Sequence, residues 1–155
     1  MGMRTIQDKT EETILIAEED SVGQSLTLKG LKRCFVDIRG TLGALYIYGC
    51  DDCSIKVAYV KSACNIYRCK DGNVEVVCQQ LRINETKNMT FEVLTKADPA
   101  LVDSKNACFK RLKLTAEHKG LLGDNFDVFE RSIAWKNVQD FQSLNGDITN
   151  FRIIE

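Results

Sequence analysis

Cysteine and histidine are the residues of this chain with the widest chemical range. Cys50 and Cys53 have the spacing with which a zinc site or a redox pair begins. No second pair has ligand spacing, and a redox pair needs a helix N-terminus to acidify its thiol, whereas these cysteines lie between strand-like segments. His118 is the only histidine, so a His-ligated metal site or a Ser-His-Asp triad has almost no material. We therefore expect structural thiols, no metal, no cofactor, and a surface position for His118.

A different kind of chemistry is indicated by Gln80 and Arg82. They alternate with the apolar residues Leu81 and Ile83, so a β-strand would turn both polar side chains to the same outer side. Arginine is enriched at the centres of protein interfaces, and a strand that presents one to solvent is suited to contact with a partner. The neighbouring strands determine which other residues share that side.

These strands come from an internal repeat. Residues 26–38 align with residues 45–57 at an offset of 19, and the same columns recur after further steps of 19, 17 and 18. Each unit alternates, turns a short corner and alternates again, and a unit this short must stack on its neighbours to bury its apolar face. We predict an all-β fold, a parallel β-helix of about four to five coils over residues 26–111. The competing folds are a β-sandwich and a left-handed hexapeptide helix, whose six-residue period is broken from Leu45 to Asp51.

The repeat also separates the outward residues into two faces. The second strand of each coil carries a column of charges, which indicates a solvated surface without a function: Asp37, Lys56, Glu75, Glu92 and Lys110. The first strand carries three tyrosines beside the single arginine, and this is the candidate partner surface: Tyr46, Tyr48, Asn65, Tyr67, Gln80, Arg82 and Asn84. The alternative is that strands favour tyrosine whatever their function.

The ends of the chain lack the repeat. We expect one domain over residues 1–155, with residues 1–5 disordered or an expression scar. Residues 112–155 lose the period and are expected to cover one end of the β-helix, because open strand edges invite aggregation. A short helix is predicted around residues 134–142. It would hold Trp135, Val138 and Phe141.

Composition excludes several partner classes. The 155 residues include 21 Lys and Arg against 22 Asp and Glu, a net charge of −1 that argues against nucleic acid or an anionic membrane as the main partner. No apolar run is long enough to span a membrane, and no membrane anchor is recognisable. Seven cysteines without an apolar signal core at the N-terminus indicate a reducing compartment, so we expect the cytoplasm.

Five motifs occur in a characteristic order, the central one being Gln80-x-Arg82 on a predicted strand. Their residue ranges are Gly23–Leu26, Gly49–Cys53, Cys78–Asn84, Pro99–Ser104 and Trp135–Phe141. Together they resemble the family of tubulin-binding cofactor C and the X-linked retinitis pigmentosa protein. The resemblance covers residues 6 to 154, nearly the whole chain.

The resemblance implies a right-handed parallel β-helix that activates a GTPase in trans and is not itself a hydrolase. Arg82 would be the arginine finger, with Gln80 as its neighbour, because a permanently charged guanidinium can meet the charge that develops on the γ-phosphate. Asn84 stands where cofactor C usually has histidine. The implied partners are tubulin with the other folding cofactors, or an Arf-like small GTPase. The implied location is the cytoplasm, in association with the cytoskeleton.

Two other function classes remain open at this stage. A cytoskeletal binding module, like the actin-binding domain of cyclase-associated proteins, could use the same scaffold without stimulating a GTPase, although Gln-x-Arg is not expected there. A carbohydrate-active β-helix enzyme would need paired carboxylates on one outer face. Glu75 and Glu92 share their column with lysines, which disfavours that class.

Overall fold

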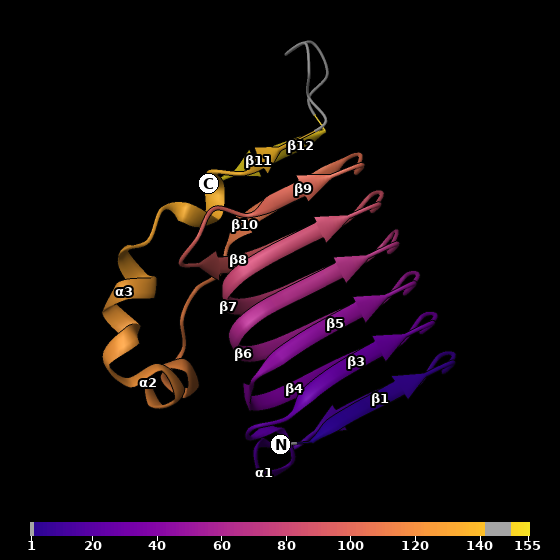
Figure 1. Ribbon diagram of the computed structural model, residues 1–155, viewed down its shortest axis with the longest axis horizontal. Coiled ribbons are helices and arrows are strands. Elements are labelled where there is room, and N and C mark those ends of the chain that lie inside the picture. The colour runs from indigo at the N-terminus through magenta and orange to yellow at the C-terminus, as the bar shows by residue number, and fades with distance from the viewer. Residues whose placement is uncertain (1, 142–149) are drawn as a thin grey trace.

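Parallel strands stacked into a solenoid make up most of the molecule (Figure 1). The computed structural model describes residues 2–141 and 150–155. Each turn of the chain contributes one strand to each of two sheets, and β6 (Ser54–Tyr67) and β7 (Asn73–Asn84) are long enough to run through both. The predicted parallel β-helix is confirmed, with about six turns in place of four to five.

Two sheets run along the stack. The first consists of β1 (Met3–Gln7), β3 (Ser25–Lys29), β5 (Ala44–Tyr48), the ends of β6 and β7, β9 (Ala100–Val102) and β11 (Gln139–Asp140). The second consists of β2 (Thr13–Ile16), β4 (Phe35–Leu42), the beginnings of β6 and β7, β8 (Thr90–Thr95), β10 (Ala107–Arg111) and β12 (Phe151–Ile154).

The extra turns lie outside the repeat that the sequence revealed. Before it, β1 and β2 form a first turn, and after it β11 and β12 extend the two sheets. The expectation that residues 1–5 are disordered is therefore wrong for Met3–Thr5, which pair with Ser25–Thr27. This turn is hard to recognise because Ile6 is the one residue of β1 that packs against the core, whereas Met3, its other apolar residue, is exposed.

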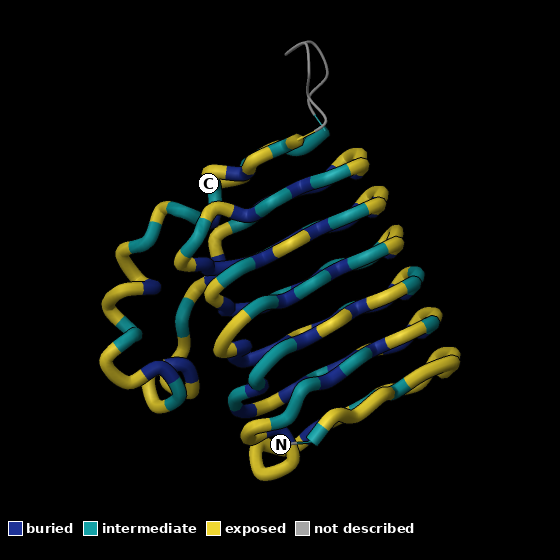
Figure 2. Tube along the Cα trace, in the orientation of Figure 1, coloured by how far each residue is buried: buried dark blue, intermediate teal, exposed yellow. Residues whose placement is uncertain are grey.

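The pairing register agrees with the repeat offsets. Leu26 lies opposite Leu45, Leu45 opposite Cys64, and Cys64 opposite Leu81. Along the strands, buried and exposed residues alternate (Figure 2), because successive side chains of a strand point to opposite sides. The inward side chains form one continuous core, in which the rings of Phe91 and Phe109 lie 5.2 Å apart.

Stacked thiols fill the corners between the sheets. All seven cysteines are buried and free. The Sγ atom of Cys53 donates to the carbonyl oxygen of Leu31 one coil earlier at 3.3 Å, and Cys69 bonds in the same way to Ile47 at 3.8 Å. Within the described residues, no group of three or more His, Cys, Asp or Glu side chains is placed to hold a metal ion. The structural interpretation of Cys50 and Cys53 agrees with their burial.

Native thiols should therefore react slowly. Burial raises the pKa of the Cys64 thiol and raises that of Cys78 to about 12, so the reactive thiolate is scarce as well as inaccessible. We expect a maleimide or aromatic disulfide reagent to label the folded chain slowly and the denatured chain at once. Rapid labelling of Cys64 and Cys78 in the folded chain would show that their columns do not face a core.

The segment after β10 lies along the side of the solenoid. It contains α2 (Ala116–Leu122), the 3-10 turn η1 (Gly123–Asn125), α3 (Phe126–Arg131) and the 3-10 turn η2 (Ala134–Lys136). Helix α2 contacts β6 and helix α3 contacts β8, so these helices cover the flank and not an end of the stack (Figure 1). The helix expected around residues 134–142 is only η2, followed by β11, and residue 142 lies outside the described residues.

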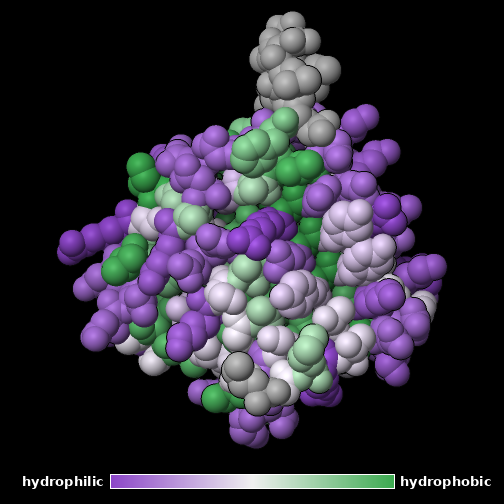
Figure 3. All heavy atoms as spheres, viewed as in Figure 1, coloured by the Kyte–Doolittle hydropathy of each residue, from purple (hydrophilic) through white to green (hydrophobic). Residues whose placement is uncertain are grey.

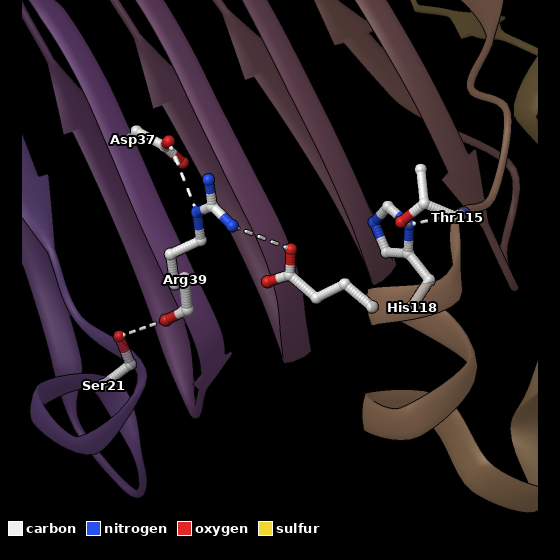
Figure 4. A network of polar contacts seen from close by, with 6 residues as sticks. Ser21, Asp37, Arg39, Thr115 and His118 are labelled. Carbon is white, nitrogen blue, oxygen red and sulfur yellow. Dashed lines mark hydrogen bonds and ion pairs between the residues drawn. The ribbon is translucent and has the colours of Figure 1, made fainter.

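His118 is buried, so its expected surface position is wrong. It is the third residue of α2, and its Nδ1 accepts a hydrogen bond from the backbone N–H of Thr115 at 3.0 Å, which forms a capping box. Next to it, Glu117 pairs with Arg39 of β4 at 3.3 Å (Figure 4). The carbonyl oxygen of Arg39 in turn accepts a hydrogen bond from Ser21 of α1 (Glu18–Ser21). These contacts fasten α2 and α1 to β4.

The buried His118 predicts a pH-dependent stability. Burial lowers its pKa below the ordinary 6.5, so between these two pKa values the unfolded chain binds more protons than the folded chain. The contribution of His118 to the free energy of unfolding is complete above about pH 6.5 and decreases as the pH falls toward its folded-state pKa. His118→Gln keeps a side-chain acceptor for the cap but does not titrate, so it should remove the pH dependence. His118→Ala also removes the cap and should lower the free energy of unfolding by about 1 kcal/mol. Urea unfolding at about pH 7.5 and about pH 5.5 measures this, and an unchanged pH dependence in His118→Gln would contradict the assignment.

Candidate functional site

The outer side of the first sheet gathers the predicted partner-binding residues. Tyr46, Asn65 and Arg82 lie side by side on β5, β6 and β7, and Tyr48, Tyr67 and Asn84 form the adjacent column. We call this surface the tyrosine face, defined by Thr27, Lys29, Tyr46, Tyr48, Asn65, Tyr67, Gln80, Arg82, Asn84, Ala100 and Val102. In Figure 3, which shows this side of the molecule, pale and green side chains lie among hydrophilic ones over the middle of the sheet.

Arg82 is exposed between Leu81 and Ile83, each 1% exposed. These two residues anchor the strand in the core, so the backbone that carries Arg82 is fixed on both sides. The Nη2 atom of Arg82 donates a hydrogen bond to Oε1 of Gln80 at 2.5 Å. Among the ion pairs of the described residues none involves Arg82, so its charge is not neutralised by a carboxylate.

An aromatic ladder lies beside Arg82. The rings of Tyr48 and Tyr67 are stacked with centroids 5.2 Å apart. The ammonium of Lys29 lies 5.7 Å from the Tyr48 ring, and the guanidinium of Arg68 lies 5.1 Å from the Tyr67 ring. Such contacts restrict the rotamers of both tyrosines, so this part of the face is formed before any partner arrives.

The two arginines of this region differ in their electrostatic surroundings. Arg68 pairs with Glu85 at 2.6 Å, and this hydrogen bond lowers the pKa of the Glu85 carboxyl. The pair is exposed and adds little to stability, but it neutralises the charge of Arg68. Arg82 is thus the guanidinium that is available to an anionic group of a partner.

The structure adds residues that the sequence did not assign to this surface. Strand β11 pairs with β9, with Gln139 opposite Ala100, and the backbone N–H of Phe141 bonds to the carbonyl oxygen of Leu101 at 3.0 Å. This register places Phe141, which is 65% exposed, after Val102 in the column of Tyr48 and Tyr67. The sequence analysis assigned Phe141 to a short helix together with Trp135 and Val138, and so missed this short strand.

The charged column of the second sheet is not the fully solvated surface that we expected. Asp37, Glu75 and Glu92 are half-buried, because the segment that leads into α2 lies over them. Burial raises the pKa of Glu92, and the neighbouring Glu75 adds to this effect. The cleft between the column and α2 has a volume of about 210 Å³ and contains His118.

Comparison with known proteins agrees with this architecture. The fold and the exposed arginine define a β-helix domain with a candidate binding face on its first sheet. A family model described as tubulin binding cofactor C matches residues 23–141, and the chain belongs to that family. None of the helices within residues 2–141 and 150–155 is long and apolar enough to cross a membrane.

Two relatives illustrate the match. Tubulin-folding cofactor C of Arabidopsis thaliana is 27% identical over 141 residues, which are 90% of this chain and 40% of the plant protein. The chain thus spans about two-fifths of the length of this relative. The solved structure of tubulin binding cofactor C from Leishmania major is 16% identical in sequence and superposes with a TM-score of 0.64. The match covers 97% of this chain and 88% of the Leishmania chain. This second likeness concerns the fold alone.

Proposed function

We propose that this chain stimulates GTP hydrolysis by tubulin in trans, with Arg82 as an arginine finger. The observation that carries the proposal is an exposed guanidinium on a rigid strand, hydrogen-bonded to Gln80 and, within residues 2–141 and 150–155, without a carboxylate partner. Membership of the tubulin binding cofactor C family, together with the name of the Arabidopsis relative, supports tubulin folding as the process. The chain would act in the cytoplasm, in association with the cytoskeleton.

The chemistry asked of this chain is electrostatic. GTP hydrolysis transfers the γ-phosphoryl group to a water molecule in the nucleotide site of the partner, and negative charge spreads over the phosphoryl oxygens in the transition state. Gln80 occupies one of the five N–H donors of Arg82, so the others can turn to those oxygens. Burial of the guanidinium in the complex strengthens the interaction, because water no longer screens it. The attacking water and the metal ion belong to the partner.

The remaining residues of the tyrosine face would bind and orient the partner. Tyr46 and Tyr48 are exposed, and tyrosine is frequent in the energetically dominant centre of interfaces. Asn65 and Asn84 flank Arg82 in the register and offer amide donors and acceptors. Their positions on a sheet, which moves less than a loop, favour a fixed distance between the finger and the partner's nucleotide.

The proposal is tested by single-turnover GTP hydrolysis with and without this chain. One series uses tubulin with the other folding cofactors, and a second series uses Arf-like small GTPases. Stimulation of GTP hydrolysis by tubulin supports the proposal. Stimulation of an Arf-like GTPase alone would support the arginine finger but show that the partner is a small GTPase. Binding without stimulation in either series contradicts the proposal and favours a cytoskeletal binding module.

A further inference from the structure

Strand β9 differs from the other strands of the tyrosine face in what it presents to a partner. Its outward residues, Ala100 and Val102, carry no polar side-chain group. On β3, β5, β6 and β7 every outward residue in the same two columns carries a hydroxyl, an amide or a charge. Ala100 and Val102 are half-buried. An outward strand position usually carries a polar side chain, so a pair of small apolar residues beside Arg82 requires an explanation.

These two residues form the floor of a groove. Its volume is about 360 Å³, and Arg82 and Asn84 of β7 line one side, with Asn65 and Tyr67 behind them. On the other side of β9 the sheet continues to β11, where Phe141 is exposed. Because neighbouring strands lie about 4.8 Å apart, short side chains on one strand between longer ones leave a depression.

We infer that this groove receives an apolar side chain of the same protein that presents its nucleotide to Arg82. The inference rests on the proposed function, because it takes the GTPase as the occupant. Stable interfaces cover about 800 Å² on each partner, a patch much wider than one strand spacing. A protein that reaches Arg82 therefore also covers Ala100 and Val102, which lie on the adjacent strand.

The chemistry of the floor selects the kind of side chain. A polar or charged group placed over Ala100 and Val102 would lose hydrogen bonds to water and gain none from the floor, because the polar side chains that line the groove lie to one side, on β6 and β7. An aliphatic or aromatic side chain gains from the same burial. The groove is large enough for one such side chain and does not extend along the whole face.

Together with Arg82, the groove would fix the orientation of the complex. A guanidinium that meets a phosphate fixes one point, and an apolar side chain in the groove fixes a second point one strand away. Two contact points fix how the sheet is aligned with the nucleotide site of the partner. A single arginine on a flat surface would leave that alignment free. Ala100 and Val102 are therefore specificity-determining residues, and a GTPase with a charge at the matching position would be rejected.

Val102→Arg tests the inference by filling the groove with a charged side chain. We expect the affinity for GTP-loaded tubulin to fall about tenfold or more, since truncating or blocking a central apolar contact has effects of this size. Val102→Thr, which keeps the shape and adds a hydroxyl to the floor, should lose affinity several-fold. The matched control is Thr90→Arg on β8 of the second sheet, which should bind as the parent does. Unchanged urea midpoints would exclude unfolding as the cause.

The outcomes separate this inference from the proposed function. If Val102→Arg binds tubulin as the parent does, the groove is not occupied, whatever Arg82→Ala does to hydrolysis. If Val102→Arg loses binding, while Arg82→Ala binds tubulin but does not stimulate hydrolysis, the result supports both the occupied groove and the arginine finger. If the parent binds but never stimulates, and Val102→Arg still abolishes binding, the groove is a docking site and the arginine finger is wrong.

Discussion

Arg82→Ala should reduce the stimulated rate of GTP hydrolysis by about 10³-fold or more, which is the size of effect that arginine fingers have. The free energy of unfolding should change by less than about 0.5 kcal/mol, because Arg82 is exposed and Leu81 and Ile83 keep the strand in the core. Arg82→Lys should restore little activity, since an ammonium cannot reproduce the planar fork of donors. Single-turnover hydrolysis and urea unfolding measure the two quantities on the same variants.

The matched control is Arg68→Ala. Arg68 lies at the edge of the same face, but Glu85 neutralises its charge. Its removal should leave stimulation within a few-fold of the parent. Equal losses in Arg68→Ala and Arg82→Ala would mean that the face acts by general positive charge. A loss of several kcal/mol of stability in Arg82→Ala would instead make Arg82 a structural residue.

Phe109→Ala should have the largest effect on folding, a loss of about 3–5 kcal/mol in the free energy of unfolding. Phe109 is fully buried, and its ring lies 5.2 Å from that of Phe91 and 6.1 Å from that of Phe151. Replacing it leaves a cavity in the middle of a row of contacting rings that connects β8, β10 and β12. Urea unfolding followed by circular dichroism measures the loss.

Phe35→Ala is the control for this prediction. Phe35 lies on β4 and is 44% exposed, so the same change of residue type should cost less than about 1 kcal/mol. Similar losses in the two variants would contradict the assignment of inward and outward columns. If Phe109→Ala lowers the free energy of unfolding only slightly, the neighbouring side chains have relaxed into the cavity.

The sequence predicted the coils because the inward residues of a solenoid obey a strict constraint. Each inward column must pack on the same column of the next coil, so Leu26, Leu45 and Cys64 recur at fixed offsets. The outward residues follow from the same register, which is why Arg82 and the tyrosines could be placed on one face from spacing alone. The role of Arg82 came from the family motif and remains a proposal.

The parts that the sequence did not predict are those held by non-repeating contacts. His118 is buried because its ring caps α2 against the flank of the sheets, and a lone histidine gives no periodic signal of this. Phe141 joins the tyrosine face through a two-residue strand, too short to show alternation. The groove beside Arg82 depends on the small size of Ala100 and Val102 relative to their neighbours, which only the three-dimensional register displays.

The most direct test of the arginine finger compares nucleotide states of the partner. In tubulin loaded with GDP and aluminium fluoride, the fluoride complex mimics the phosphoryl group in the transition state. A side chain that acts in the transition state binds such a mimic more tightly than it binds the ground state. The parent chain should bind this complex about 10²-fold more tightly than GDP-loaded tubulin, and Arg82→Ala should bind both equally. Equal affinities of the parent for the two states would contradict the account.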